Sequence, residues 1–314
     1  MTRNRPAQDI VFGASGFIGS HLAEQLCLAG KTVTTPIRQH NALLEQLGCP
    51  QPCPDFSDEH ALIRCIEGHE RIYSCLANPR RHLPIAALRE VEVTLTGRLI
   101  RAAAQAGAKR FILLSTVMVY GFSRPPYPID ETWPARPEHP FNRVALEREH
   151  NAREMAAACG IELVIVRPAT TLGRRDQAMR PLFTTFRHGY FPVFGTGAWR
   201  FSAIDARDLG CALAFLGTHP LAAEQIWLAR GYDTDWLTLK QTLEQIAGEG
   251  KRTHLLHLPL PLARRLGDLT DRLCPYRIEP ALTRFSVDVM STDTLFNDQK
   301  LRNIGWQPRF HLND

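Results

Sequence analysis

Short apolar runs alternate with longer segments of helical pattern through the first half of the chain. The runs lie at 9–12, 32–37, 71–76, 111–115 and 162–166, and a weaker one lies near Cys53. They are rich in Val, Ile and Leu, as strands that are covered on both faces usually are. The longest run, 111–120, is interpreted as a buried strand. Parallel strands joined by crossover helices give this order, so the pattern predicts an α/β fold.

Four helices are predicted between these strands, at 17–29, 57–66, 84–106 and 141–159. Their interiors are rich in alanine, and each is followed by a glycine suited to end a helix: Gly30, Gly68, Gly107 and Gly160. A strand and a helix return at 204–216, and the final third is helix-rich and interrupted by prolines. We expect a first domain at 1–172 with a return segment near 203–230, and a smaller lobe from 173–202 and 231–314.

The regular pattern fails at 123–140, which is dense in proline, and again after Pro168, where turns mix with one short helix. Such proline-dense segments cannot belong to the sheet. In open α/β folds, long excursions on the carboxyl side of the strands build the ligand pocket. These two loops are therefore predicted to line a substrate pocket.

A glycine-rich loop, GASGFIG, follows the first predicted strand and opens the first helix. Gly13, Gly16 and Gly19 allow a tight turn and a close approach of the backbone to a pyrophosphate. Amide N–H groups at the helix start, around Ser15, Phe17 and Ile18, would donate to its oxygens, and the helix dipole favours negative charge there. The strand, loop and helix in register favour a dinucleotide site over a turn without a ligand.

The end of the second strand indicates which dinucleotide is bound. An acidic side chain there would bind the 2′-hydroxyl of NAD, but the chain has Ile37 at that position, with Arg38 next to it. An arginine suits a 2′-phosphate, so NADP(H) is favoured over NAD(H). The alternative is that Arg38 is an ordinary solvated arginine.

Composition narrows the class further. The chain has 314 residues and a net charge of +5, from 37 basic and 32 acidic residues spread along it, which does not favour nucleic-acid binding. Its eight cysteines form no disulfide framework, and Cys49 and Cys53 lack a second pair at ligand spacing, so no metal is expected. No apolar leader opens the chain, and run 111–120 is half the roughly 20 residues of a membrane span. A cytoplasmic protein with a small-molecule substrate and no membrane partner is expected, and a homodimer is left open.

Several motifs along nearly the whole chain resemble those of the extended short-chain dehydrogenase/reductase family, which includes nucleotide-sugar epimerases and dehydratases. They are GASGFIG, PDFSD at 54–58, CLANP at 75–79, KRFILLSTVMVYG at 109–121, VRPATTLG at 166–173, the segment from Phe201 and LRNIGWQPRF near the C-terminus. The resemblance implies a Rossmann-type, doubly wound parallel sheet with a smaller, mostly helical C-terminal lobe over the active site. It also implies that Asp55 and Phe56 frame the adenine, that Ala77 and Asn78 line the cofactor cleft, and that Pro168 lies near the nicotinamide.

The catalytic set of that family is only partly present. Thr116 fits the family's serine or threonine in the strand before VYG, but the tyrosine and the lysine four residues later fall on Phe141 and Ala145. Phenylalanine has no ionisable oxygen and alanine no charge, so the usual proton-transfer pair is absent. Glu92 stands where an asparagine is common, which weakens support for a proton relay.

Two hypotheses remain. One is an oxidoreductase, or a related epimerase or dehydratase, in which Thr116 polarises a carbonyl and Tyr120 or His139 supplies the proton. Each of these residues also has an ordinary structural explanation, as a locally bonded hydroxyl, a packing aromatic and a loop residue. The other hypothesis is a catalytically silent, cofactor-binding sensor or partner protein.

Overall fold

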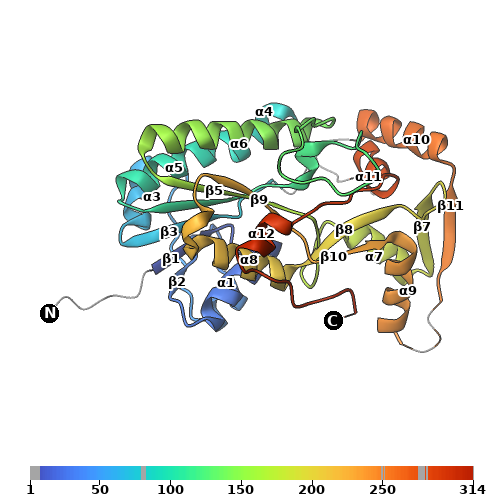
Figure 1. Ribbon diagram of the computed structural model, residues 1–314, viewed down its shortest axis with the longest axis horizontal. Coiled ribbons are helices and arrows are strands. Elements are labelled where there is room, and N and C mark those ends of the chain that lie inside the picture. The colour runs from blue at the N-terminus through green and yellow to red at the C-terminus, as the bar shows by residue number, and fades with distance from the viewer. Residues whose placement is uncertain are drawn as a thin grey trace.

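The central sheet has six parallel strands in the order β2-β1-β3-β4-β5-β9 (Figure 1). This computed structural model describes residues 8–78, 83–248, 250, 252–274, 280 and 282–313. The strands are β1 (Gln8–Phe12), β2 (Val33–Thr34), β3 (His69–Ser74), β4 (Arg110–Leu114), β5 (Glu162–Pro168) and β9 (Gln225–Ala229). From β1 the chain goes first to one side, as β2, and then to the other, as β3. The topological switch point, where ligands of such sheets bind, therefore lies between the carboxyl ends of β1 and β3.

Helices cover both faces of this sheet, which explains why its strands are almost continuously apolar. On one face, α1 (Phe17–Leu28) packs with α8 (Ala206–Thr218) around buried Val11, Ile112 and Val164. On the other face, α3 (Glu59–Ile66), α5 (Leu95–Gln105) and α6 (Pro140–Cys159) cover Ile10 and Leu113. The predicted doubly wound α/β fold is confirmed.

Some predicted elements were wrong in detail. The second half of run 111–120 is a 3-10 helix, η2 (Val117–Tyr120), because the Thr116 hydroxyl caps its start by accepting from the Met118 amide. The helix predicted over 84–106 is instead α4 (Ile85–Arg89), a π-helical turn η1 (Glu90–Thr94) and α5 in succession. A short helix that the pattern did not predict, α2 (Ala42–Gln46), follows β2.

The weak strand expected near Cys53 is not formed as a strand in the part of the chain that is described. The segment still lies beside β2, because the amides of Thr35 and Ile37 donate to the carbonyls of Pro50 and Pro52 at 2.8 and 3.0 Å. Proline has no N–H to donate in return, so only half of a strand ladder can form.

The smaller lobe forms one end of the molecule (Figure 1). It contains α7 (Arg180–Arg187), β7 (Tyr190–Phe194), α9 (Trp236–Ile246), β11 (His254–Leu258), α10 (Leu260–Leu273) and α11 (Arg284–Met290). β11 pairs in parallel with β7, and a second small sheet joins β6 (Thr170–Leu172), β8 (Arg200–Asp205) and β10 (Tyr232–Asp235). Helix exceeds strand in the lobe, as predicted.

The end of the chain returns to the main sheet. A short turn, η3 (Pro220–Ala222), precedes β9, and α12 (Gln299–Asn303) packs against β9. Phe296, Leu301 and Trp306 lie in the core of the main sheet, so the assignment of all of 231–314 to the lobe remains a prediction. None of the helices described here is both long and apolar enough to cross a membrane.

Candidate functional site

The glycine loop closes tightly between β1 and α1. Gly13 has φ +81°, and the Gly16 amide donates to its carbonyl at 3.0 Å. A Cβ at Gly13 would lie 2.7 Å from the Cys75 carbonyl oxygen, and one at Gly19 would lie 2.2 Å from the Gly13 carbonyl oxygen. Side chains at these two positions would collide with backbone. The loop after β1 thus packs directly on the loop after β3, at the switch point.

The N-terminus of α1 fits a phosphate group. Gly16 is the N-cap, no side chain caps the helix, and the first turn has no acidic residue. Ser15 and Gly16 are exposed. The amides of the first turn have no acceptor within the helix, and the helix dipole adds positive potential there.

The residues predicted to bind the adenosine end lie on two neighbouring segments. Ile37 is 5% exposed, whereas Arg38 is exposed. The Cys53 thiol lies 3.9 Å from the Arg38 carbonyl oxygen, which brings the PDFSD segment alongside. Asp55 accepts from the hydroxyl and the amide of Ser57 at 2.6 and 2.8 Å, and these bonds lower the pKa of its carboxyl. The Phe56 ring packs edge-on against Phe12 in β1.

Ala77 and Asn78 follow β3 on the other side of the switch point, while Pro79 of the same motif lies outside the described residues. Ala77 is exposed. The Asn78 amide donates to Glu92 Oε1 at 2.7 Å. Pro168 is buried at the end of β5. The structure thus brings the glycine loop and the Ala77–Asn78 loop together. The residues predicted to bind the adenosine lie on the other side of β1, next to β2.

A buried ion pair fixes the strand ends behind this loop. Glu92, in the π-helical turn η1, is 1% exposed and lies 2.5 Å from Nη1 of Arg148 on α6. Arg148 also donates to the carbonyls of Leu76 and Leu114 at 3.0 and 2.8 Å. That Glu92 weakens support for a proton relay stays a prediction. Glu92 and Arg148 together hold the loop after β3 and the end of β4, with a π-turn of the kind that often occurs at functional sites.

A second buried pair lies beside the first. Glu149 accepts from Arg167 at 2.5 and 2.9 Å and from the Ser115 hydroxyl at 2.5 Å. Burial raises the pKa of Glu149, but the bonds from Arg167 and Ser115 outweigh it, so that the pKa is lowered. Arg148, Glu149 and Arg167 were not predicted from the sequence. A signal was available for two of them, since Arg148 and Glu149 share the inward face of α6 with Ala145 and Ala152.

The predicted catalytic residues have different surroundings. Thr116 lies two residues beyond β4, not in the strand, and is partly exposed; its Oγ1 accepts from the Met118 amide at 3.2 Å. Tyr120 is 1% exposed, with Arg167 and Phe296 packed on its ring, and burial raises its pKa. Phe141 and Ala145 lie one turn apart on α6, and Ala145 is 2% exposed.

His139 precedes α6 and contacts the small lobe. Its Nε2 lies 3.2 Å from Asp288 of α11, and its ring packs edge-on against Phe122 and Phe285. Arg284 also binds Asp288, at 2.9 Å. Burial raises the pKa of Asp288, but the bonds from His139 and Arg284 lower it further than burial raises it. This contact joins the lobe to the beginning of the helix that carries Phe141.

Loop 123–140 also brings an arginine into the interior. The guanidinium of Arg124 has no hydrogen-bond partner among the described residues and lies 4.8 Å from the centre of the Phe296 ring. Burial lowers the pKa of Arg124 to about 10.

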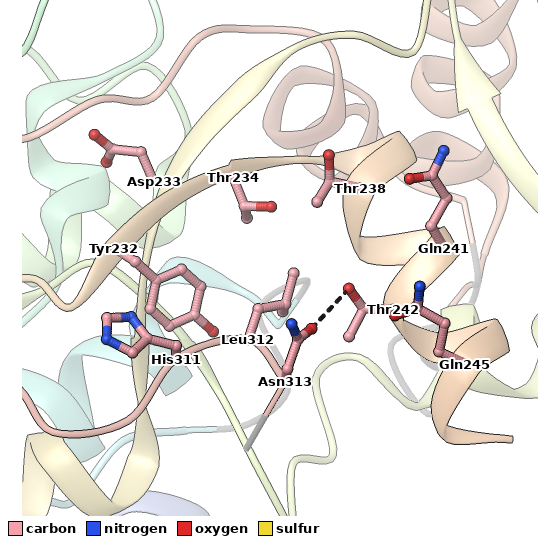
Figure 2. A pocket seen from close by; sticks show the side chains of 10 residues that line it. All are labelled: Tyr232, Asp233, Thr234, Thr238, Gln241, Thr242, Gln245, His311, Leu312 and Asn313. Carbon is pink, nitrogen blue, oxygen red and sulfur yellow. Dashed lines mark hydrogen bonds between the residues drawn. The ribbon is translucent and has the colours of Figure 1, made fainter.

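A separate open pocket of about 380 Å³ lies in the small lobe (Figure 2). Hydroxyl and amide side chains from β10 and α9 face the C-terminal segment 311–313 across it, and Thr242 bonds Asn313 at 3.4 Å. None of the residues predicted from the sequence lines this pocket. No cluster of three or more metal-ligating side chains was found in the described part of the chain.

Comparison with known proteins agrees with this geometry. A model of the NAD dependent epimerase/dehydratase family matches residues 10–228. The N-acetyl-alpha-D-glucosaminyl-diphospho-ditrans,octacis-undecaprenol 4-epimerase of Escherichia coli O157:H7 is 23% identical, over 96% of this chain and 91% of that protein. The UDP-glucose 4-epimerase of Vibrio cholerae is 24% identical, over 86% of each chain.

Solved structures show the same fold. The UDP-glucose 4-epimerase of Thermotoga maritima superposes with a TM-score of 0.77 at 18% identity, covering 98% of this chain and 95% of that one. With the family model matching more than half of its length, this chain belongs to the NAD dependent epimerase/dehydratase family.

Proposed function

We propose that this chain is an NADP(H)-dependent oxidoreductase, or a related epimerase or dehydratase, that acts on a small carbonyl or alcohol substrate without the tyrosine–lysine pair. The observation that carries the proposal is the glycine loop, in which Gly13 and Gly19 leave no room for a side chain and the first turn of α1 is uncapped. The diphosphate of the cofactor would bind the amides of Phe17 and Ile18, since the Gly16 amide already donates to the Gly13 carbonyl.

The preference for NADP(H) rests on Arg38. Arg38 is exposed beside the Asp55–Phe56 segment, and Ile37 occupies the position where an acid would bind a free ribose. A guanidinium can form two charge-assisted hydrogen bonds with a 2′-phosphate. Asp55 and Phe56 would frame the adenine, Ala77 and Asn78 would line the cleft, and Pro168 would lie near the nicotinamide.

When bound, the nicotinamide supplies or accepts a hydride. Thr116 Oγ1 already accepts a hydrogen bond from the Met118 amide, so its own proton is free to be donated to a substrate carbonyl oxygen. His139 lies two residues before Phe141, and Asp288 of α11 holds its ring in place. We assign proton transfer to this imidazole. Tyr120 was the other candidate, but its burial under Arg167 and Phe296 favours a packing role.

A second function, cofactor binding without turnover, is favoured by Phe141 and Ala145. Both lie on α6 where the family places its proton-transfer pair, and neither can exchange a proton or hold a charge. In that case the protein would act as a sensor of NADP(H) or as a partner subunit.

Two measurements separate these functions. Fluorescence titration should give tighter binding of NADPH than of NADH, and Arg38→Glu should reverse that order. NADPH oxidation is then followed with a panel of carbonyl compounds that begins with oxidised sugar nucleotides, because the relatives are sugar epimerases. If the wild type oxidises NADPH with one of these compounds and Thr116→Val does not, the oxidoreductase function is supported. Binding without turnover, with activity gained only in the Phe141→Tyr, Ala145→Lys double variant, supports the silent protein.

A further inference from the structure

Exposed apolar side chains gather at one end of the small lobe. Of the twelve large apolar side chains that the described residues expose, seven belong to β7, β11 and α10. They are Tyr190, Leu255, Leu256, Leu262, Leu266, Leu269 and Leu273, with exposed fractions from 37% to 71%. Single exposed leucines are normal, but a contiguous group marks an interaction surface.

Four of these leucines form a stripe along α10. Leu262, Leu266, Leu269 and Leu273 follow one another at intervals of four, three and four residues, which places them on one side of the helix. We call them the leucine stripe.

Small residues attach α10 to the rest of the lobe. Ala263 is fully buried in a cluster with Phe194 and Val287, and a Cβ at Gly267 would lie 2.7 Å from the Arg284 amide. Close contact at these two residues fixes the helix on α11, while the leucine stripe stays 37% to 71% exposed.

The charges beside the leucine stripe are positive. Arg265 and Arg272 each lie three residues beyond a stripe leucine, both are exposed, and neither forms an ion pair with a described residue. The acids of the helix both contact Arg284: Asp268 pairs with it at 3.2 Å and Asp271 accepts from its amide at 3.0 Å. Asp268 lies three residues after Arg265 and four before Arg272, so it borders the arginines on the side away from the leucines. The exposed side of α10 therefore combines leucines with unpaired arginines.

The strand β11, which precedes α10, adds two further exposed leucines to this end of the lobe. Leu255 and Leu256 are consecutive, so they point to opposite faces of the strand, yet both are exposed. β11 and α10 are adjacent in the chain and lie at the same end of the molecule (Figure 1).

We propose that the leucine stripe docks the small lobe on the surface of an anionic lipid bilayer. The leucines would enter the interface while Arg265 and Arg272 reach the phosphate headgroups. The sequence predicted no membrane partner, but the apolar runs on which that prediction rested bear only on a helix that spans the membrane.

Docking in this way has a consequence for the site. The opposite side of α10 rests on α11, which contacts His139 through Asp288. The membrane surface would therefore bind the lobe that joins the beginning of α6. This inference does not depend on the proposed enzymatic function.

Sedimentation with vesicles tests the proposal on the full chain. Vesicles of phosphatidylcholine with one quarter phosphatidylglycerol should carry the protein into the pellet. The triple variant Leu262→Gln, Leu266→Gln, Leu269→Gln should bind at least about tenfold more weakly. Arg265→Gln with Arg272→Gln should weaken binding about 30-fold, and pure phosphatidylcholine should bind the wild type correspondingly less.

A matched control triple is available elsewhere on the surface. Leu28→Gln, Leu221→Gln, Ile246→Gln removes three apolar side chains that are 65% to 75% exposed, and it should leave vesicle binding unchanged. The proposal is overturned if the wild type stays in the supernatant, or if the control triple weakens binding as much as the α10 triple. It is also overturned if ultracentrifugation shows a dimer that only the α10 triple dissociates.

Discussion

Removing the charge of Glu92 should destabilise the fold by an amount that the structure allows us to calculate. Glu92→Gln keeps an oxygen for the Asn78 amide but leaves Arg148 as a buried, unpaired cation. Breaking such a pair costs about 3 kcal/mol. A chain of 314 residues unfolds with an entropy of about 0.7 kcal/mol/K, so Tm should fall by about 5 °C.

The double variant Glu92→Gln, Arg148→Met separates charge from packing, because it removes both charges. Differential scanning calorimetry should show that the double variant has a higher Tm than Glu92→Gln alone. This order is expected even though the introduced methionine cannot donate to the carbonyls of Leu76 and Leu114, as Arg148 does. A Glu92→Gln variant within 1 °C of the wild type, or a double variant that loses more than the two single variants together, would refute the reasoning.

Three further predictions concern the loop, the second ion pair and the threonine. Gly19→Ala, whose Cβ would lie 2.2 Å from the Gly13 carbonyl oxygen, should weaken NADPH binding at least about 100-fold in calorimetry, whereas Gly97→Ala, whose Cβ meets only side chains, should bind normally. The pKa of Glu149 is lowered in the folded state, so the contribution of its carboxylate to stability is complete above the ordinary pKa of 4.5 and is lost as the pH falls through the lowered pKa. In urea unfolding, the difference in free energy of unfolding between the wild type and Glu149→Gln should therefore be large at pH 7 and shrink below pH 4. A difference that does not change with pH would contradict this prediction. Thr116→Val should abolish turnover of any substrate found while leaving the NADPH Kd within about twofold of the wild-type value, and Thr116→Ser should retain turnover. Equal activity in the wild type and both variants would show that the Thr116 hydroxyl has no role in the reaction.

The sequence predicted the sheet, the main helices and the glycine loop because each depends on local signals. Glycines with positive φ end the predicted helices at Gly30, Gly68, Gly107 and Gly160, and short apolar runs mark strands that are covered on both faces. Where two local signals compete, prediction failed: the apolar run 111–120 is strand only as far as Leu114, because the Thr116 cap starts a 3-10 turn.

The environment of the candidate site was less predictable, since it depends on contacts between distant residues. Glu92 and Arg148 are 56 positions apart, and only the packing of η1 against α6 makes them a pair. The exposed side of α10 was equally hidden, because a leucine at helical spacing normally predicts burial, and only the tertiary structure shows which side Ala263 and Gly267 occupy.

Isothermal titration calorimetry with NADPH on the wild-type chain and on Gly19→Ala is the decisive experiment for the nucleotide site. We expect one NADPH per chain at micromolar Kd for the wild type, weaker binding of NADH, and binding of NADPH to the variant that is at least about 100-fold weaker. No heat of binding to the wild type at millimolar NADPH or NADH, from protein shown to be folded, would contradict the assignment of the glycine loop and of the function built on it.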